Sequence, residues 1–143
     1  TKGHIAYVFP EKLFCGDTLF VGGCGRIFEG TAEQMQNSLG KFKDLPAKTL
    51  VYCAHEYTEK NLEFALTVEP NNKTLSDKIN SVRSLRADGR STVPSTVGEE
   101  RAINPFLRWD SVEIQQNLKG RFPSLSLDPV SVLGKVRQLK DSF

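Results

Sequence analysis

Three short apolar runs in the first half of the chain are bounded by turn-forming residues. Residues 4–9, 13–15 and 49–53 are rich in aromatic, aliphatic and β-branched side chains, and proline or glycine follows the first two. Runs of this composition and length predict β-strands. The glycine-rich stretch 22–25 indicates tight turns or a close approach of the backbone to a ligand.

Amphipathic stretches lie between these runs and after them. Thr31 and Gln34 have the spacing of a capping box, and a helix is expected from there to just before Pro46. A second helix is expected over residues 58–68. The resulting order of strand, loop, helix, strand, loop and helix is typical of α/β proteins.

The second half of the chain predicts helices. Leu75, Ile79 and Val82 form the apolar stripe of a helix that Thr74 is expected to cap and Gly89 to end. The remaining expectations are an irregular stretch over residues 91–105, a short helix after Asp110, and a last helix from Asp128-Pro129 to about Lys140. The last helix has an apolar face that predicts packing, formed by Val132, Val136, Leu139 and Phe143. A soft boundary near residue 70 divides the chain into segments 1–70 and 71–143.

Composition narrows the classes of function. The chain has 143 residues, 38% hydrophobic and 25% charged, which suits one globular domain of ordinary size. Its 19 basic and 17 acidic residues give a formal net charge of +2, which argues against a nucleic-acid or membrane-surface partner. No apolar run approaches the length of a transmembrane span.

The three cysteines are Cys15, Cys24 and Cys53, and their spacing fits no zinc-finger pattern. We interpret them as reduced core thiols of an intracellular protein. A catalytic thiol would need a nearby histidine, and neither His4 nor His55 lies in the context of a cysteine hydrolase.

Two residues that can ligate a metal each follow a predicted strand. Asp17 comes after the second run and His55 after the third, and strand ends are where α/β proteins place their sites. An aspartate and a histidine there are candidate metal ligands. The alternatives are an aspartate that caps a turn and a structural histidine. Two ligands are also fewer than the three or more protein donors of a tight catalytic site.

Cations on the last helix form a second candidate group. Arg137 and Lys140 are three residues apart, so they lie on one helical face. Both side chains can bind one carboxylate, or they can be solvated residues that complement the helix dipole. Arg26, Phe28 and Tyr57 lie near the candidate ligands and would suit a peptide-like ligand, and the alternative there is an exposed arginine with buried rings.

Six segments in chain order carry a resemblance to a known family. They are GHI at 3–5, FCGDTLF at 14–20, GCGRIFEGT at 23–31, CAHEYT at 53–58, NPFLR at 104–108 and RQLKDSF at 137–143. Together they resemble the C-terminal part of glyoxalase II, within the metallo-β-lactamase superfamily. The resemblance implies an α/β fold, with the C-terminal half of an αββα sandwich over residues 1–70 and a helical glutathione-binding region over 71–143.

The resemblance also implies roles for individual residues. Asp17 matches a carboxylate that bridges two divalent metals, zinc or a mixture with iron or manganese, and His55 matches a ligand of the second metal. A metal-bound hydroxide would cleave S-2-hydroxyacylglutathiones, turning S-D-lactoylglutathione into D-lactate and glutathione. The positions that match glutathione contacts are Arg26, Ile27, Phe28, His55, Tyr57, Arg137 and Lys140. Arg26 replaces a common lysine and Phe28 replaces a tyrosine of some relatives.

The family's histidine-rich motif, Thr-His-x-His-x-Asp-His, is absent from this sequence. The resemblance therefore places two of seven expected metal ligands in this chain, and His4 matches a non-ligand position. We expect a fragment of an ordinary enzyme whose N-terminal segment is missing. The alternatives are a non-catalytic module that binds glutathione conjugates or a partner chain, and a purely structural domain. The intact protein is expected to be a cytoplasmic monomer, or organellar if a transit peptide is missing.

Overall fold

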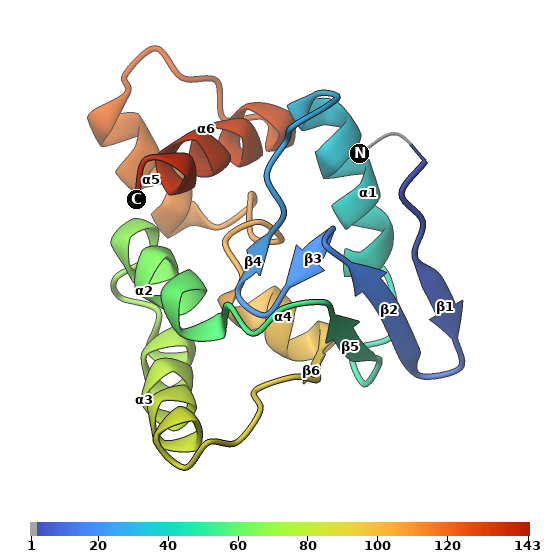
Figure 1. Ribbon diagram of the computed structural model, residues 1–143. Helices are drawn as coiled ribbons and strands as arrows, with labels where there is room; N and C mark the ends of the chain where they lie inside the picture. The colour runs from blue at the N-terminus through green and yellow to red at the C-terminus, as the bar shows by residue number, and fades with distance from the viewer. Residues whose placement is uncertain (1–2) are drawn as a thin grey trace.

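The computed structural model describes residues 3–143, which form a four-stranded sheet, a small two-stranded sheet and six helices (Figure 1). The strands are β1 (Tyr7–Phe9), β2 (Lys12–Gly16), β3 (Leu19–Phe20), β4 (Gly23–Cys24), β5 (Leu50–Cys53) and β6 (Ser95–Thr96). The helices are α1 (Ala32–Lys43), α2 (Thr58–Val68), α3 (Lys73–Ala87), α4 (Val97–Ile103), α5 (Val112–Arg121) and α6 (Pro129–Asp141).

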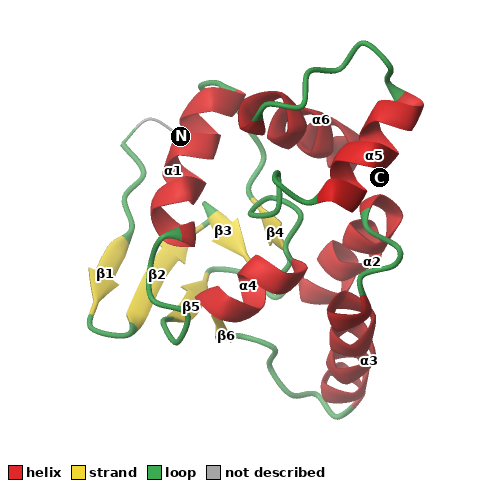
Figure 2. Ribbon diagram, turned by 180° about the vertical axis from the view of Figure 1, so that it is seen from behind, coloured by secondary structure: helices red, strands yellow, loops and turns green. Residues whose placement is uncertain are grey.

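The larger sheet is mixed, with the order β1-β2-β5-β6. Strands β2 and β5 pair in parallel, and the two outer pairs are antiparallel. Leu13, Cys15 and Val51 are fully buried on one face, in the same cluster as Leu39 of α1 and Val97 of α4. Both helices lie on that face of the sheet (Figure 2). The predicted α/β class and the helical second half are confirmed.

Local capping chemistry fixes several helix starts where the sequence predicts them. The hydroxyl of Thr31 accepts from the backbone N–H of Gln34, whose side chain accepts from the N–H of Thr31, so the capping box is present. Asp128 caps α6, with proline at its first position. Gly89 follows α3 with a φ of 69°, a left-handed conformation that glycine adopts without strain.

Three details of the predicted elements are wrong. Residues 91–105 are not irregular throughout, because β6 and α4 lie within them. The N-cap of α3 is Asn72 rather than Thr74, and its side chain accepts from the N–H of Leu75. Strand β1 is also shorter than the apolar run at 4–9.

The main hydrophobic cluster contains buried residues from both sides of residue 70, including Val51 and Leu118. A second cluster joins α2, α3 and the end of α4 through Leu62, Leu75 and Ile103. The boundary near residue 70 stays a prediction. Among the helices of residues 3–143, none is long and apolar enough to cross a membrane.

Candidate metal and ligand site

The parallel pairing of β2 and β5 brings the two predicted metal ligands together. Gly16 and Cys53 are register partners, so both strands end at the same edge of the sheet. Asp17 directly follows β2, and His55 lies two residues beyond β5. Their side chains meet, with Nε2 of His55 3.3 Å from Oδ1 of Asp17, and both are about half exposed.

Backbone bonds hold the turn that carries Asp17. Gly16 has a φ of 53°, and the N–H of Thr18 donates to the carbonyl of Cys15 at 3.0 Å. Nε2 of His4 lies 3.2 Å from the same carbonyl. This position gives His4 a contact with the backbone of the turn, and the non-ligand role of His4 stays a prediction.

Aromatic rings and a carboxylate fix the loop around His55. The imidazole stacks on the ring of Tyr57 with a centroid distance of 4.9 Å, and Phe20 lies 6.0 Å away. The next residue, Glu56, accepts hydrogen bonds from the side chain of Ser91 and from the backbone and hydroxyl of Thr92. The loop is therefore anchored to the segment that precedes β6.

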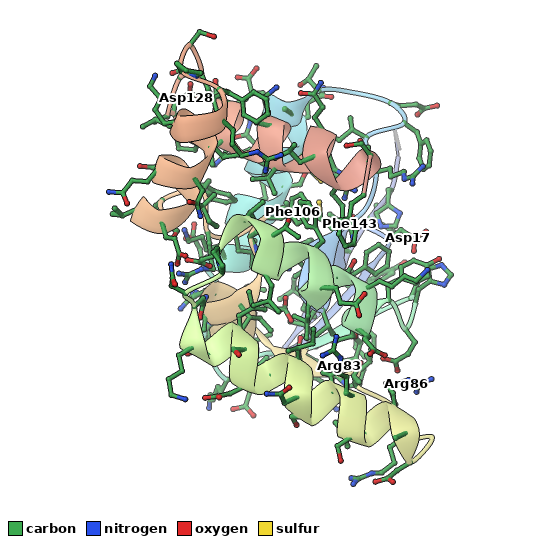
Figure 3. All side chains as sticks on the ribbon, turned by 90° about the vertical axis from the view of Figure 1, so that its left-hand side faces the viewer. Asp17, Arg83, Arg86, Phe106, Asp128 and Phe143 are labelled. Atoms are coloured by element: carbon green, nitrogen blue, oxygen red, sulfur yellow. The ribbon has the colours of Figure 1, made fainter. Side chains whose placement is uncertain are left out.

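A pocket of about 650 Å³ opens beside the Asp17–His55 pair. Residues from the hairpin β3–β4, from α2 and from the last turn of α6 line it. Figure 3 shows Asp17 and Phe143 toward the same side of the molecule. Asp128, at the start of α6, lies at the opposite end of the molecule. Of the glutathione-contacting residues that the resemblance implies, the pocket collects Arg26, Phe28, His55, Tyr57, Arg137 and Lys140. Ile27 lies instead in a neighbouring depression of about 410 Å³.

Lys140 presents a cation in a partly buried position. Its Nζ donates to the carbonyl of Lys60 at 3.1 Å and lies 5.1 Å from the ring centroids of Phe64 and Phe143. Burial, together with the nearby positive charges of Arg137 and Lys60, lowers the pKa of Lys140 to about 8. An anion bound beside Lys140 would favour the charged form of the side chain and so raise its pKa again.

Arg137 is buried rather than solvated, with 5% of its surface exposed. Its Nη1 donates to the carbonyl of Cys24 at 2.9 Å, and its Nη2 lies 3.0 Å from Oδ1 of Asp141. The interpretation of Arg137 as a solvated dipole partner is therefore wrong. The guanidinium fixes the end of the hairpin β3–β4 against α6, and it lines the pocket from that position.

The alternative that the rings of Phe28 and Tyr57 are buried is wrong. Phe28 is 80% exposed and Tyr57 50% exposed. Phe143, predicted as a packing residue of the last helix, is 63% exposed and packs edge-on against Phe64 at 5.6 Å. Exposed aromatic surfaces at a concave site offer contact area to a ligand.

The sequence reasoning missed several pocket residues on α2. Lys60, Asn61 and Glu63 line the pocket together with Tyr57. Residues 57, 60 and 61 have helical spacing, so they lie on one face at the start of α2. This spacing could have indicated that Lys60 and Asn61 line the pocket beside Tyr57.

The Asp17–His55 pair fits a divalent metal as two donors of a larger set. A carboxylate oxygen and an imidazole nitrogen are donors that zinc, iron and manganese accept. The two atoms lie 3.3 Å apart at an open strand edge. Within residues 3–143, no group of three or more His, Cys, Asp and Glu side chains gathers to hold a metal.

Comparison with known proteins places the chain in a family. The family model described as "Hydroxyacylglutathione hydrolase C-terminus" matches residues 56–143. A hydroxyacylglutathione hydrolase from Rippkaea orientalis is 53% identical over 150 residues, covering 100% of this chain and 56% of the relative. One from Synechococcus sp. is 54% identical over 145 residues, and one from Shewanella baltica is 54% identical over 146, covering 100% of this chain and 55% and 56% of those relatives.

The matched region is the helical part of a class of hydrolases, and the matches extend over the sheet as well. The chain belongs to the hydroxyacylglutathione hydrolase family, whose members are also called glyoxalase II. It spans about half the length of the curated relatives it matches.

Proposed function

We propose that this chain forms the glutathione-binding part of a hydrolase of S-2-hydroxyacylglutathiones such as S-D-lactoylglutathione. The observation that carries the proposal is the Asp17–His55 pair, 3.3 Å apart and open to a pocket that cations and aromatic rings line. The names of the relatives support the substrate class. In the reaction, water adds to the thioester carbonyl, the carbon–sulfur bond breaks, and glutathione leaves with D-lactate as the acid product.

Two divalent metals, zinc or a mixture with iron or manganese, would supply Lewis acidity at the thioester carbonyl when bound. Asp17 and His55 would be two of the residues that hold these metals. Because a catalytic metal site needs at least three protein donors, we infer that the remaining donors come from outside residues 3–143. The sheet of this chain would then be half of a metallo-β-lactamase sandwich.

The chain's own residues would bind and orient the glutathione part. Lys140 offers its ammonium group to a carboxylate, since charge-assisted hydrogen bonds are the strong ones. Nε of Arg26 lies 3.6 Å from Oδ1 of Asp141. The side chain of Arg26 is 62% exposed, so it remains accessible to a ligand. Tyr57 and Phe143 would cover the apolar parts of the peptide. The pocket would contribute to catalysis by holding the thioester beside Asp17 and His55.

Elemental analysis of the 143-residue chain, combined with an assay of S-D-lactoylglutathione hydrolysis on the same sample, tests the division of labour. We expect less than one tightly bound metal per chain and no turnover, while binding of S-methylglutathione persists. Paired metals with turnover would refute this division of labour, because the 143-residue chain would then complete the metal site without a further segment, for example by pairing with a second copy. An absence of S-methylglutathione binding would refute the proposed glutathione pocket.

Lys140 should make ligand binding depend on pH above neutrality. Because the pKa of Lys140 is about 8, its charge is present below that pH and is lost as the pH rises through it. The affinity for S-methylglutathione, whose thiol is blocked, should therefore fall between pH 7 and pH 9. Lys140→Met should weaken binding roughly tenfold at pH 7, about 1.4 kcal/mol, and should remove the fall. Isothermal titration calorimetry across this range measures both effects.

The matched control is Lys140→Arg, which keeps the positive charge throughout the range. The fall in affinity should be much smaller in this variant. If Lys140→Arg shows the same fall as the natural protein, the titrating group is the amine of the ligand, and the role given to Lys140 is wrong.

A further inference from the structure

The hairpin β3–β4 connects the predicted metal ligand Asp17 with the cationic rim of the pocket at Arg26. Asp17 precedes the hairpin, Arg26 follows it, and Phe20 and Cys24 line the pocket from within it. Only two residue pairs join its strands, at Leu19↔Cys24 and Phe20↔Gly23. A ladder this short is too weak to fix the position of the hairpin by itself.

Three side chains, from α2, from α4 and from the residue that follows α4, hold the turn of this hairpin. Each of the four residues 20–23 has a backbone group bonded to one of them. The bonds run from Nδ2 of Asn61 to the carbonyl of Val21 (3.1 Å), from Nδ2 of Asn104 to the carbonyls of Phe20 (3.2 Å) and Gly23 (3.0 Å), and from the N–H of Gly22 to Oε2 of Glu100 (2.9 Å).

Glu100 is the acidic member of this set, and it is completely buried. Its Oε2 accepts from Gly22 and from Nδ2 of Asn104 at 2.8 Å. Its Oε1 and the hydroxyl oxygen of Ser95 are buried and interact with each other, but neither atom has a hydrogen bond of regular geometry among residues 3–143. Buried polar atoms without partners are costly, and neither the sheet nor the pocket contacts described above requires a carboxylate here.

The surroundings of Glu100 do not neutralise a negative charge. The ionisable groups that interact electrostatically with Glu100 include Glu99 on its own helix and the thiols of Cys15 and Cys53 on the sheet, and all three are acidic types. Burial raises the pKa of Glu100 to about 7, although Ser95, Asn104 and the N–H of Gly22 lower it. The carboxyl group therefore changes its protonation near neutral pH, and Oε1 changes with it between a donor and an acceptor toward Ser95.

We propose that Glu100 is a positioning residue for the candidate site. Through the N–H of Gly22 it holds the hairpin so that Phe20 packs against His55 and Tyr57 and the pocket keeps its shape. Phe20 lies 5.2 Å from Tyr57 and 6.0 Å from His55 by ring centroids, so a displaced hairpin would move the aromatic wall beside both predicted metal ligands. Only the consequence for glutathione affinity rests on the proposed function.

Three variants of the full chain test this proposal at pH 7.5. Glu100→Ala removes the acceptor, and Glu100→Gln keeps a carbonyl acceptor for Gly22 and adds an amide donor that can face Ser95. Ile103→Val is the control, because Ile103 lies on the same helix and is fully buried in the second cluster. The readouts are hydrogen exchange of the Gly22 amide, the chemical shifts of the Phe20 and Tyr57 ring protons, and affinity for S-methylglutathione.

We expect Glu100→Ala to speed exchange at Gly22 roughly tenfold, to shift both sets of ring signals, and to weaken ligand binding about fivefold. Glu100→Gln and Ile103→Val should stay within about twofold of the natural protein in exchange and affinity. The Gly22 amide proton should also titrate with a midpoint near pH 7 in the natural protein and lose that titration in Glu100→Gln, a result that a merely structural role would not produce.

Two outcomes would overturn the proposal. The first is unchanged Gly22 exchange in Glu100→Ala or, should that variant not fold, a Gly22 titration that survives in Glu100→Gln. The second is a ring-proton shift in Ile103→Val as large as in Glu100→Ala, which would make the effect one of general stability. If the natural protein does not bind S-methylglutathione, the proposed function fails, while exchange and ring shifts still decide the role of Glu100.

Discussion

Gly25→Ala is expected to lower the free energy of unfolding by about 2–3 kcal/mol, the cost of overpacking a tightly packed site, and to abolish most of the affinity for S-methylglutathione. A Cβ atom at this position would overlap the carbonyl oxygen of Asp17. That oxygen belongs to the backbone and cannot rotate away, so the turn that carries Asp17 must move. Urea unfolding and calorimetric titration of the ligand measure the two effects.

Gly40→Ala is the matched control for this substitution. Gly40 lies within α1, and a Cβ atom there would have open space around it. This variant should gain up to about 1 kcal/mol, because alanine favours the helix over glycine, and it should keep the ligand affinity. Equal stability and affinity of Gly25→Ala and the natural protein would show that the close approach to Asp17 does not matter.

The sequence predicted that Asp17 and His55 each follow a strand, because the apolar runs 13–15 and 49–53 predict strands that end just before them. It did not predict how these strands pair. The structure pairs them in parallel with the register Gly16↔Cys53, and the carboxyl ends of parallel strands meet at one edge of a sheet. Helix starts at Thr31 and Asp128 were also predictable, since capping depends on residues a few positions apart.

Helix α4 was missed because its inward face carries an acidic residue. Val97, Glu100 and Ile103 are buried at helical spacing, but a glutamate interrupts the apolar stripe on which the prediction of a helix depends. Thr96 and Glu99 nevertheless have capping-box spacing, and the hydroxyl of Thr96 accepts from the N–H of Glu99. A start signal was therefore present at a site where a buried carboxylate obscured the pattern.

Contacts distant in sequence account for the other differences. Asn72 rather than Thr74 caps α3, because its amide also donates to the carbonyl of Ala102 at 2.8 Å and to Glu69 at 2.9 Å. Helical spacing put Arg137 and Lys140 on one face, but the guanidinium of Arg137 is buried through tertiary contacts with the carbonyl of Cys24 and the ring of Phe106. Such burial depends on the tertiary arrangement, which spacing along one helix does not contain.

A buried ion pair at the end of α2 joins four helices. Glu69 has a side chain only 3% exposed, and it receives two hydrogen bonds from Arg108 at 2.6 and 2.8 Å. Ser111, the N-cap of α5, and Asn72, the N-cap of α3, also donate to it. Arg108 donates in turn to the carbonyl of Arg101 in α4 at 2.9 Å.

The balance of these contacts determines how Glu69 titrates. Burial alone would raise the pKa of Glu69, but the hydrogen bonds from Arg108, Ser111 and Asn72 outweigh it and hold the pKa below its usual value. A carboxyl group with a lowered pKa contributes stability above its unfolded-state pKa of about 4.3, and loses it as the pH falls.

Arg108→Ala should therefore lower the free energy of unfolding by roughly 3–5 kcal/mol at pH 7, because it leaves a buried carboxylate without its cation. Burial would then dominate, the pKa of Glu69 would rise, and the loss should be smaller at pH 4.5, where the group can bind a proton. Adding Glu69→Gln to Arg108→Ala should recover part of the loss at pH 7. Urea unfolding at both pH values measures these differences.

The control for this network is Lys73→Ala, which breaks the ion pair between Lys73 and Asp77. Their side chains are 86% and 66% exposed, so this variant should change stability by no more than about 0.5 kcal/mol at either pH. A loss in Arg108→Ala that is equally small, or that is the same at pH 4.5 and pH 7, would contradict the role of Glu69. Because the same carboxylate fixes the ends of α2, α3 and α5, a large loss would also mean that the helical half depends on this single buried charge pair.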